Sequence, residues 1–324
     1  MERRFSRIVC AAWLLLAVAC GPRRAKAPAA SAARPFPAVE IPALITEPQE
    51  RIQYASLHFW DRYLSQLAPA DTLAYGGLSQ DDAEKQMGIF VTLLQQAPPA
   101  VGQDAMNAFM DGLEAAQRRV PQGHILADMA QLTHHYLYDP TSPLRSEELY
   151  LPFVSRLAAS ALVEPSRKMA YAWDARMCAL NRPGTPAADF TFVDTQGRTR
   201  TLYGIQAGYI LLIFGNPDCH ACKELMEDMS ALPDVSALIE SGRLKVLDIY
   251  IDEDIEPWKQ KMADYPAAWI NGYDPHFVIR TDLLYNVRAL PSIYLLDQDK
   301  TVLLKDAETS QVLDRLSAGG QDLS

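Results

Sequence analysis

The sequence lacks several features that would assign it to common classes of protein. Acidic side chains outnumber basic ones by 40 to 30, a formal net charge of −10, so the chain has no excess of positive charge for binding nucleic-acid phosphates. The apolar run at residues 8–19 is too short to cross a bilayer. No repeat of fixed length is evident, which argues against a solenoid. These absences favour an ordinary globular protein that does not bind nucleic acid.

Cysteine is also scarce, with five residues in the whole chain: Cys10, Cys20, Cys178, Cys219 and Cys222. The last two have Cys-x-x-Cys spacing, and no second pair with that spacing exists. A structural zinc ion usually takes four Cys or His ligands, which this set cannot supply. The His134–His135 pair falls in a helical pattern and is interpreted as part of a helix surface. We therefore expect neither a metal nor another cofactor.

The first twenty residues have the pattern of a targeting segment. Three arginines precede the apolar run, and the run ends in Ala17-Val18-Ala19-Cys20-Gly21. This resembles a bacterial lipoprotein signal, in which the cysteine becomes the lipidated first residue. The third position before the cysteine usually carries Leu and here carries Ala17, and Ala17–Ala19 would also suit ordinary signal peptidase. We expect residues 1–20 to be a lipoprotein signal peptide and Cys20 a lipid-anchored residue facing the periplasm, with a soluble periplasmic protein as the alternative.

Composition divides the remainder into three parts. Residues 21–46 are rich in Ala, Pro and Arg and predict a flexible tether. Residues 47–180 carry apolar residues at steps of three and four, interrupted by prolines, which predicts an all-helical bundle of five or six helices. In residues 181–324, short apolar runs and hairpin turns alternate with helical patterns. We expect this last part to form a mixed α/β sheet flanked by helices.

The Cys-x-x-Cys pair lies at a junction that suits redox chemistry. Cys219-His220-Ala221-Cys222 follows the apolar run 209–214 and precedes a helical pattern that begins at Lys223. The free N–H groups at a helix N-terminus stabilise a thiolate on the first cysteine, and the second lies one turn further on. Export from the cytosol would let a disulfide persist. By contrast, Cys178 lies in an apolar helical stretch, where a free cysteine packs as a small hydrophobic residue.

Three motifs in order along residues 181–324 resemble the thioredoxin superfamily. They are Gly184-x-x-Ala187-x-Asp189-Phe190, the Cys-x-x-Cys pair, and Arg288-Ala289-Leu290-Pro291-Ser292-Ile293. The last stands where the family places a cis-proline facing the disulfide. More narrowly, this part resembles the membrane-tethered TlpA-like group, which is related to the AhpC/TSA peroxidases. Together with the helical N-terminal domain, the chain also resembles a bacterial lipoprotein family whose helical domain has no assigned function.

The resemblance implies a thioredoxin-like fold and thiol–disulfide oxidoreductase activity, in the direction of disulfide reduction. Cys219 would attack a disulfide of a partner protein, and Cys222 would resolve the mixed disulfide. Leu290 and Pro291 would contact the bound substrate. The implied electron donor is a membrane-bound or periplasmic thiol-redox protein.

The chain departs from the family at two positions. Asp218 replaces the Trp that many relatives carry before the first cysteine, and Ile213 stands where thioredoxin has a buried acid. Asp218 and His220 are candidates to tune the thiolate in opposite senses: a protonated His220 would favour it and Asp218 would oppose it. Glu224, Asp248 or Asp252 could replace the missing acid as proton acceptor, or water could do so.

Two other functions are considered. Peroxiredoxins carry Pro-x-x-x-Thr-x-x-Cys, but Leu212 and Asn216 occupy the corresponding positions before Cys219, so a thiol peroxidase fits poorly. Alternatively, the chain is a non-catalytic envelope lipoprotein whose helical domain binds a partner, and the cysteine pair is a static disulfide. A labile pair would favour the enzyme, and an inert pair would favour the scaffold.

Overall fold

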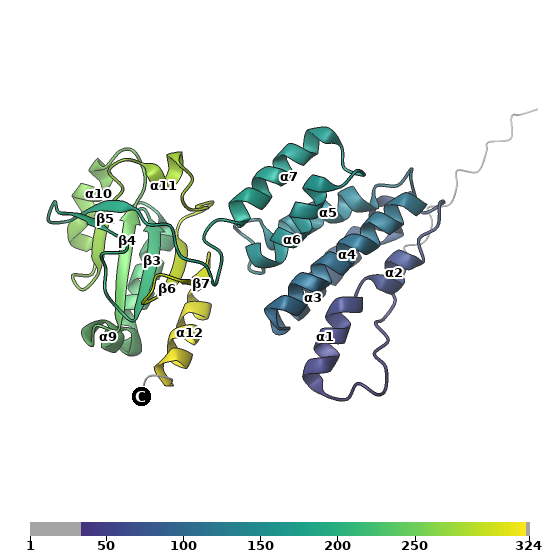
Figure 1. Cartoon of the computed structure of the whole chain (residues 1–324), viewed down its shortest axis with the longest axis horizontal. Coiled ribbons are helices and arrows are strands. Elements are labelled where there is room, and N and C mark those ends of the chain that lie inside the picture. The colour runs from purple at the N-terminus through teal and green to yellow at the C-terminus, as the bar shows by residue number, and fades with distance from the viewer. Residues whose placement is uncertain (1–33, 322–324) are drawn as a thin grey trace, which may run out of the picture. The chain divides into compact units, whose positions relative to one another are not determined.

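The computed structural model describes residues 34–321 of the chain (Figure 1). Residues 48–178 of this part are helical. They form seven α-helices and one 3-10 helix: α1 (Pro48–His58), α2 (Asp61–Ser65), η1 (Ala74–Gly77), α3 (Gln80–Gln96), α4 (Pro99–Arg119), α5 (Ile125–Leu137), α6 (Glu147–Ala159) and α7 (Pro165–Cys178).

Local sequence accounts for where these helices begin. The side chain of Ser79 accepts a hydrogen bond from the backbone N–H of Asp82 at the start of α3, and Ser146 accepts one from Leu149 at the start of α6. Helices α4 and α7 begin with proline, whose fixed φ suits the first helical turn and whose missing N–H costs nothing there. Residues near each start thus account for where α3, α4, α6 and α7 begin.

The expected five or six helices were too few. The apolar stripe expected to form one helix divides at Phe59–Trp60 into α1 and α2, and both rings at the joint are buried. Only the end of α7, around Met177 and Cys178, was expected to be helical, because the apolar stripe of the rest is weak: Trp173 remains 48 % exposed. The core holds a run of contacting aromatic rings, in which the Phe109 ring lies 5.2 Å from that of Trp60 and 5.6 Å from that of Phe153.

The segment before α1 also differs from expectation. Phe36 packs its ring 5.1 Å from that of Trp60 and 5.3 Å from that of Phe59. The Arg34 guanidinium pairs with the Asp71 carboxylate at 2.9 Å. Residues 34–46 were assigned to a flexible tether, but apolar burial and this ion pair hold the start of that stretch against the helices.

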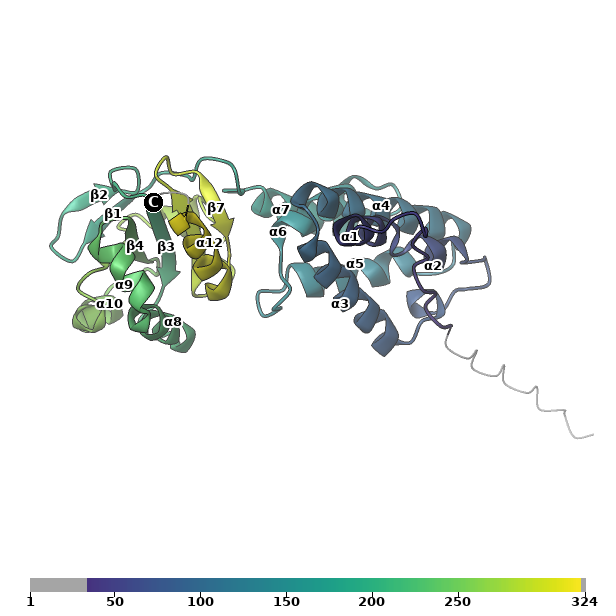
Figure 2. The same ribbon diagram turned by 90° about the horizontal axis from the view of Figure 1, so that it is seen from below.

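Residues 191–305 contain a seven-stranded mixed sheet (Figure 2). Its order is β2-β1-β5-β4-β3-β6-β7. The strands are β1 (Thr191–Asp194), β2 (Thr199–Thr201), β3 (Tyr209–Gly215), β4 (Leu244–Tyr250), β5 (Ile270–Tyr273), β6 (Ser292–Asp297) and β7 (Val302–Lys305). Strands β3, β4 and β5 are parallel to their neighbours in this trio, and β6 runs antiparallel to β3.

The central strands are apolar on both faces because each face is covered. The helices that follow β3 are α8 (His220–Ala231), α9 (Pro233–Glu240), α10 (Glu256–Lys261), α11 (Val278–Thr281) and α12 (Thr309–Gln321), with a short 3-10 helix η2 (Met262–Asp264). One face packs against apolar side chains of α8, α9 and α12. The other is covered by α11 and by apolar residues of the segments that precede β1, follow β2 and precede β6. This mixed sheet between helices, preceded by a helical domain, is the predicted fold class.

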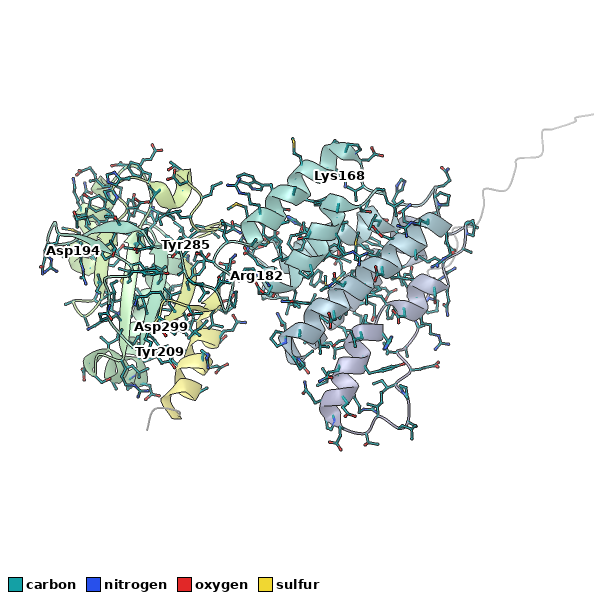
Figure 3. All side chains as sticks on the ribbon, viewed as in Figure 1. Lys168, Arg182, Asp194, Tyr209, Tyr285 and Asp299 are labelled. Carbon is teal, nitrogen blue, oxygen red and sulfur yellow. The ribbon has the colours of Figure 1, made fainter. Side chains whose placement is uncertain are left out.

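A buried ionic cluster joins the helical domain to the end of the sheet. The Glu147 carboxylate at the start of α6 lies 2.6 Å from the Lys305 ammonium and 3.1 Å from the Arg288 guanidinium, and it accepts a hydrogen bond from the Asn286 amide at 2.6 Å. Arg182, which follows α7 and is labelled in Figure 3, pairs with Glu148 at 2.7 Å.

Within residues 34–321, no helix has the length and apolarity needed to cross a membrane.

Candidate functional site

The turn after β3 positions the cysteine pair. The strand ends at Gly215, and the Asn216 side chain then accepts a hydrogen bond from the Asp218 N–H at 2.8 Å. The backbone carbonyl of Asn216 accepts one from the Cys219 N–H at 3.0 Å. These bonds turn the chain so that Cys219 becomes the N-cap residue of α8. A buried strand that ends in a polar turn thus delivers the first sulfur to a helix N-terminus.

The Cys219 sulfur lies between two backbone groups. Its Sγ atom accepts a hydrogen bond from the Cys222 N–H at 3.2 Å, the kind of contact that stabilises a thiolate. The same Sγ lies 3.5 Å from the carbonyl oxygen of Leu290, and the Leu290–Pro291 peptide bond is cis. The two cysteines and the two residues expected to bind substrate therefore converge at one place.

Cys222, the second cysteine, loses its thiol proton less readily than a free cysteine. Burial raises the pKa of the Cys222 thiol, and a hydrogen bond between its side chain and that of Cys219 acts in the same direction. Cys222 lines a cavity of about 560 Å³ together with nine other residues: Asn216, Pro217, Lys223, Met226, Glu227, Asp248, Lys261, Asp264 and Tyr265. The pair is therefore asymmetric: a backbone N–H donates to the Cys219 sulfur, whereas burial favours the neutral thiol of Cys222.

Of the three acids considered for the proton-accepting role, Asp248 is the one that lines this cavity. It lies on β4 directly beside Ile213 of β3, so the neighbouring strand brings a carboxyl group next to the position where β3 carries an isoleucine. Its side chain is buried, and a Cβ atom on Gly215 would lie only 3.1 Å from Asp248 Oδ1. Burial raises the pKa of Asp248 from 3.8 to about 7. This carboxyl group therefore changes its protonation near neutral pH beside Cys222.

The other two acids considered for this role are placed differently. Glu224 lies exposed on α8 and pairs with His220 at 3.2 Å. Asp252 accepts a hydrogen bond from the Asn216 amide at 2.5 Å and pairs with the Arg280 guanidinium at 2.9 Å. Neither lines the cavity that holds Cys222.

Both residues expected to tune the thiolate have a partner of opposite charge. Asp218 pairs with the Lys261 ammonium, and the His220 ring is 87 % exposed beside Glu224. Each pair presents a smaller net field to Cys219 than an isolated charge would, and solvent screens both pairs because both are exposed. The hydrogen bond from the Cys222 N–H is the more direct influence on the sulfur.

The structure separates the remaining candidates from the pair. Cys178 is buried in the helical domain at the end of α7, where burial raises the pKa of its thiol. Cys20 lies outside the described residues. Among residues 34–321, no group of three or more Cys, His, Asp or Glu side chains is arranged to hold a metal ion.

Lys261 and Tyr265 are among the cavity residues that sequence reasoning missed. Lys261 was not singled out because it lies some forty positions from Cys219, and only the folded chain brings its ammonium to the carbonyl of Pro217 and the carboxylate of Asp218. Tyr265 follows in the same segment, and burial is the largest cause of its raised pKa. No local motif signals either residue.

The raised pKa of Asp248 predicts a dependence of stability on pH. The folded state holds the Asp248 proton more tightly than the unfolded state. The stability that protonated Asp248 contributes is therefore fully present below its pKa in the unfolded chain and is lost as pH rises through its pKa in the folded protein. Wild type should therefore lose on the order of 4 kcal/mol relative to Asp248→Asn between about pH 4 and pH 8. Urea unfolding across this range measures the difference. Asp252→Asn is the control, and a difference between wild type and Asp248→Asn that does not change with pH would contradict the prediction.

Comparisons with known proteins agree with this geometry. Residues 19–179 match a family described as a domain of unknown function (DUF5106). The crystal structure of a thioredoxin-like protein from Bacteroides caccae is 34 % identical, with a TM-score of 0.79, and the match covers 88 % of this chain and 99 % of that one. The C-terminal domain of an uncharacterized protein from Bacteroides fragilis is 45 % identical over 42 % of this chain and 98 % of its own, with a TM-score of 0.41. No curated protein matches. With a relative of this identity matched over nearly its whole length, the chain belongs to the thioredoxin-like proteins of the thioredoxin superfamily.

Proposed function

We propose that the protein is a thiol–disulfide oxidoreductase that reduces disulfides in other proteins through Cys219 and Cys222. The observation that carries the proposal is the position of the Cys219 sulfur. It caps α8, accepts the Cys222 N–H at 3.2 Å, and lies 3.5 Å from the carbonyl oxygen of Leu290. The N–H donor at a helix N-terminus suits a nucleophilic cysteine, and the sulfur stands beside backbone that an incoming peptide can contact.

The exchange proceeds in two steps. The Cys219 thiolate attacks one sulfur of the substrate disulfide, forms a mixed disulfide and releases the other sulfur as a thiolate. The Cys222 thiolate then attacks the Cys219 sulfur, forms the Cys219–Cys222 disulfide and releases the second substrate thiolate. Two electrons pass from the dithiol to the substrate. A second protein dithiol, in a membrane or periplasmic thiol-redox protein, supplies the two electrons that restore the pair.

The second step requires that Cys222 lose its proton, and burial opposes this ionisation. Asp248 lines the same cavity, which at about 560 Å³ has room for several water molecules of about 30 Å³ each. In the proposed mechanism, the ionised Asp248 carboxylate receives the Cys222 proton through water. Its pKa of about 7 suits a group that gives and takes a proton at neutral pH.

The proposed site of action is the periplasmic side of the bacterial cell envelope, with Cys20 as the lipid anchor. The sequence of residues 1–20 supports this location. An anchored reductase would meet protein disulfides where they form.

The test is to trap the substrate in the native envelope. In Cys222→Ser, the mixed disulfide cannot be resolved, so the full-length protein should accumulate disulfide-linked adducts that a reductant releases. The double variant Cys219→Ser/Cys222→Ser is the matched control and should capture nothing. The adducts should stay with the membrane fraction and move to the soluble fraction when Cys20→Ser is added. Absence of adducts, together with a Cys219–Cys222 pair that does not equilibrate with glutathione, would favour the non-catalytic scaffold.

A further inference from the structure

A second groove lies beside the cysteine pair, on the side of Leu290 and Pro291. Its volume is about 310 Å³, at the lower end of the range of about 300–1,000 Å³ typical of ligand sites. Its walls come from three parts of the chain: Ala221, Glu224, Leu225 and Asp228 of α8; residues 289–293 and 306–309 around β6 and β7; and Pro140 and Arg145 of the helical domain. The helical domain therefore forms part of the surface next to the reacting sulfur.

The helical wall of this groove is held in place. It is the segment 138–146 between α5 and α6, where the Ser142 hydroxyl donates to the Tyr136 carbonyl at 2.7 Å and the Ser146 N–H donates to the Leu137 carbonyl at 2.9 Å. These bonds hold the segment against the end of α5. The segment is therefore an ordered wall of the groove as well as a connection between two helices.

Arg145 fixes this wall against the sheet. Its guanidinium lies 3.4 Å from the Asp306 carboxylate and also pairs with Glu308. The neighbouring Ala307 N–H donates to the carbonyl of Ile293 at 3.1 Å, close to Pro291. The segment between β7 and α12 therefore connects the helical wall to the substrate-contact candidates.

The groove carries more negative than positive charge. Asp306 and Glu308 share the Arg145 cation, and Asp306 also accepts from Arg288 at 2.8 Å. Glu224 has only the exposed His220 ring as a partner, and Asp228 is exposed with no cation paired to it in the described part of the chain. A bound segment that carries a positive charge would complement the two α8 carboxylates.

We propose that this groove binds the segment flanking the disulfide of a protein substrate, that segment 138–146 forms one of its walls, and that it selects segments carrying Lys or Arg. The inference rests on the proposed function. A chain lying in the groove passes Leu290, whose carbonyl is 3.5 Å from the Cys219 sulfur, so a cysteine at its end meets the nucleophile. In this view, the helical domain contributes substrate selection.

The experiment compares three disulfides with the full chain at low ionic strength. Two are peptide disulfides that differ only in Lys or Glu beside the cysteine, and the third is the small, uncharged bis(2-hydroxyethyl) disulfide. Wild type should show a kcat/KM about tenfold higher for the Lys peptide, since roughly 1.4 kcal/mol of complementary charge is a factor of ten. The double variant Glu224→Gln/Asp228→Asn should reduce this ratio to about threefold or less. Glu240→Gln on α9 is the control and should leave the ratio unchanged.

A second pair of variants tests the helical wall. Pro140→Lys adds a cation to the groove and should lower the Lys-to-Glu ratio by about threefold or more. Gln131→Lys adds the same charge on the exposed side of α5 and should leave it unchanged. Equal kcat/KM for the two peptides in wild type, with turnover of the small disulfide intact, would overturn the inference and leave the proposed function standing. If Pro140→Lys and Gln131→Lys gave the same Lys-to-Glu ratio, segment 138–146 would not contribute to substrate selection. Failure to reduce all three disulfides would instead refute the proposed function.

Discussion

Cys219→Ser should reduce disulfide turnover to the uncatalysed background. A serine hydroxyl at the N-cap of α8 can still accept a hydrogen bond, so the helix should form, but oxygen cannot form the mixed disulfide on which exchange depends. Reduction of insulin in the presence of a dithiol donor measures the effect. The variant should unfold at nearly the same urea concentration as wild type, which separates lost chemistry from lost structure.

Cys178→Ala provides the matched thiol control. Cys178 is fully buried in the helical domain, and burial raises the pKa of its thiol, so it does not act as a thiolate at neutral pH. Alanine fits the same apolar site, and turnover should stay within about twofold of wild type. If Cys219→Ser kept substantial activity while Cys178→Ala lost it, the assignment of the nucleophile would be wrong.

Glu147→Ala should lower the free energy of unfolding by about 3–5 kcal/mol. The Glu147 side chain is 4 % exposed and contacts the Lys305 ammonium, itself 2 % exposed, and the Arg288 guanidinium. Removing the carboxylate leaves the buried Lys305 ammonium without a counter-ion and leaves Arg288 paired with Asp306 alone. Burial also raises the pKa of Glu147, although both cations act to lower it, so the native cluster holds its charges at a desolvation cost.

The neighbouring residue offers a control of the same size and charge. Glu148 pairs with Arg182 at 2.7 Å but is 27 % exposed, and Glu148→Ala should cost no more than about 1 kcal/mol. Urea titration of both variants measures the comparison. Equal losses for the two would show that the buried cluster contributes no more than a surface ion pair.

Strong local patterns predicted much of the fold. The apolar run of β3 and the cysteine pair after it predicted the strand, the turn and α8, and the motif around Pro291 predicted which loop would face the sulfur. By contrast, β5 was not expected, because its Ile-Asn-Gly-Tyr sequence has weak strand propensity. Its position beside β4 makes it a strand, and Gly272 fits there because a Cβ atom would lie 2.7 Å from the Val193 carbonyl.

The position of Asp248 could not be predicted from the sequence alone. Asp248 was one of three candidates because composition along a strand does not reveal which residue of the next strand lies beside it. The register that pairs Asp248 with Ile213 decides the question, and register depends on contacts between segments far apart in the chain. The groove wall formed by segment 138–146 was beyond prediction for the same reason.

The ammonium of Lys305 donates to the Cys178 carbonyl at 2.9 Å and also contacts the carbonyls of Met177 and Leu180, at the carboxyl end of α7. One side chain of the final strand thus neutralises both the partial negative charge of that helix end and the Glu147 carboxylate. Cutting the chain near residue 180 would remove Glu147 from both Lys305 and Arg288. Arg288 stands only two residues before Leu290. An excised C-terminal fragment would therefore be a poor surrogate for kinetics, because its cis-proline loop would have lost the scaffold that braces it.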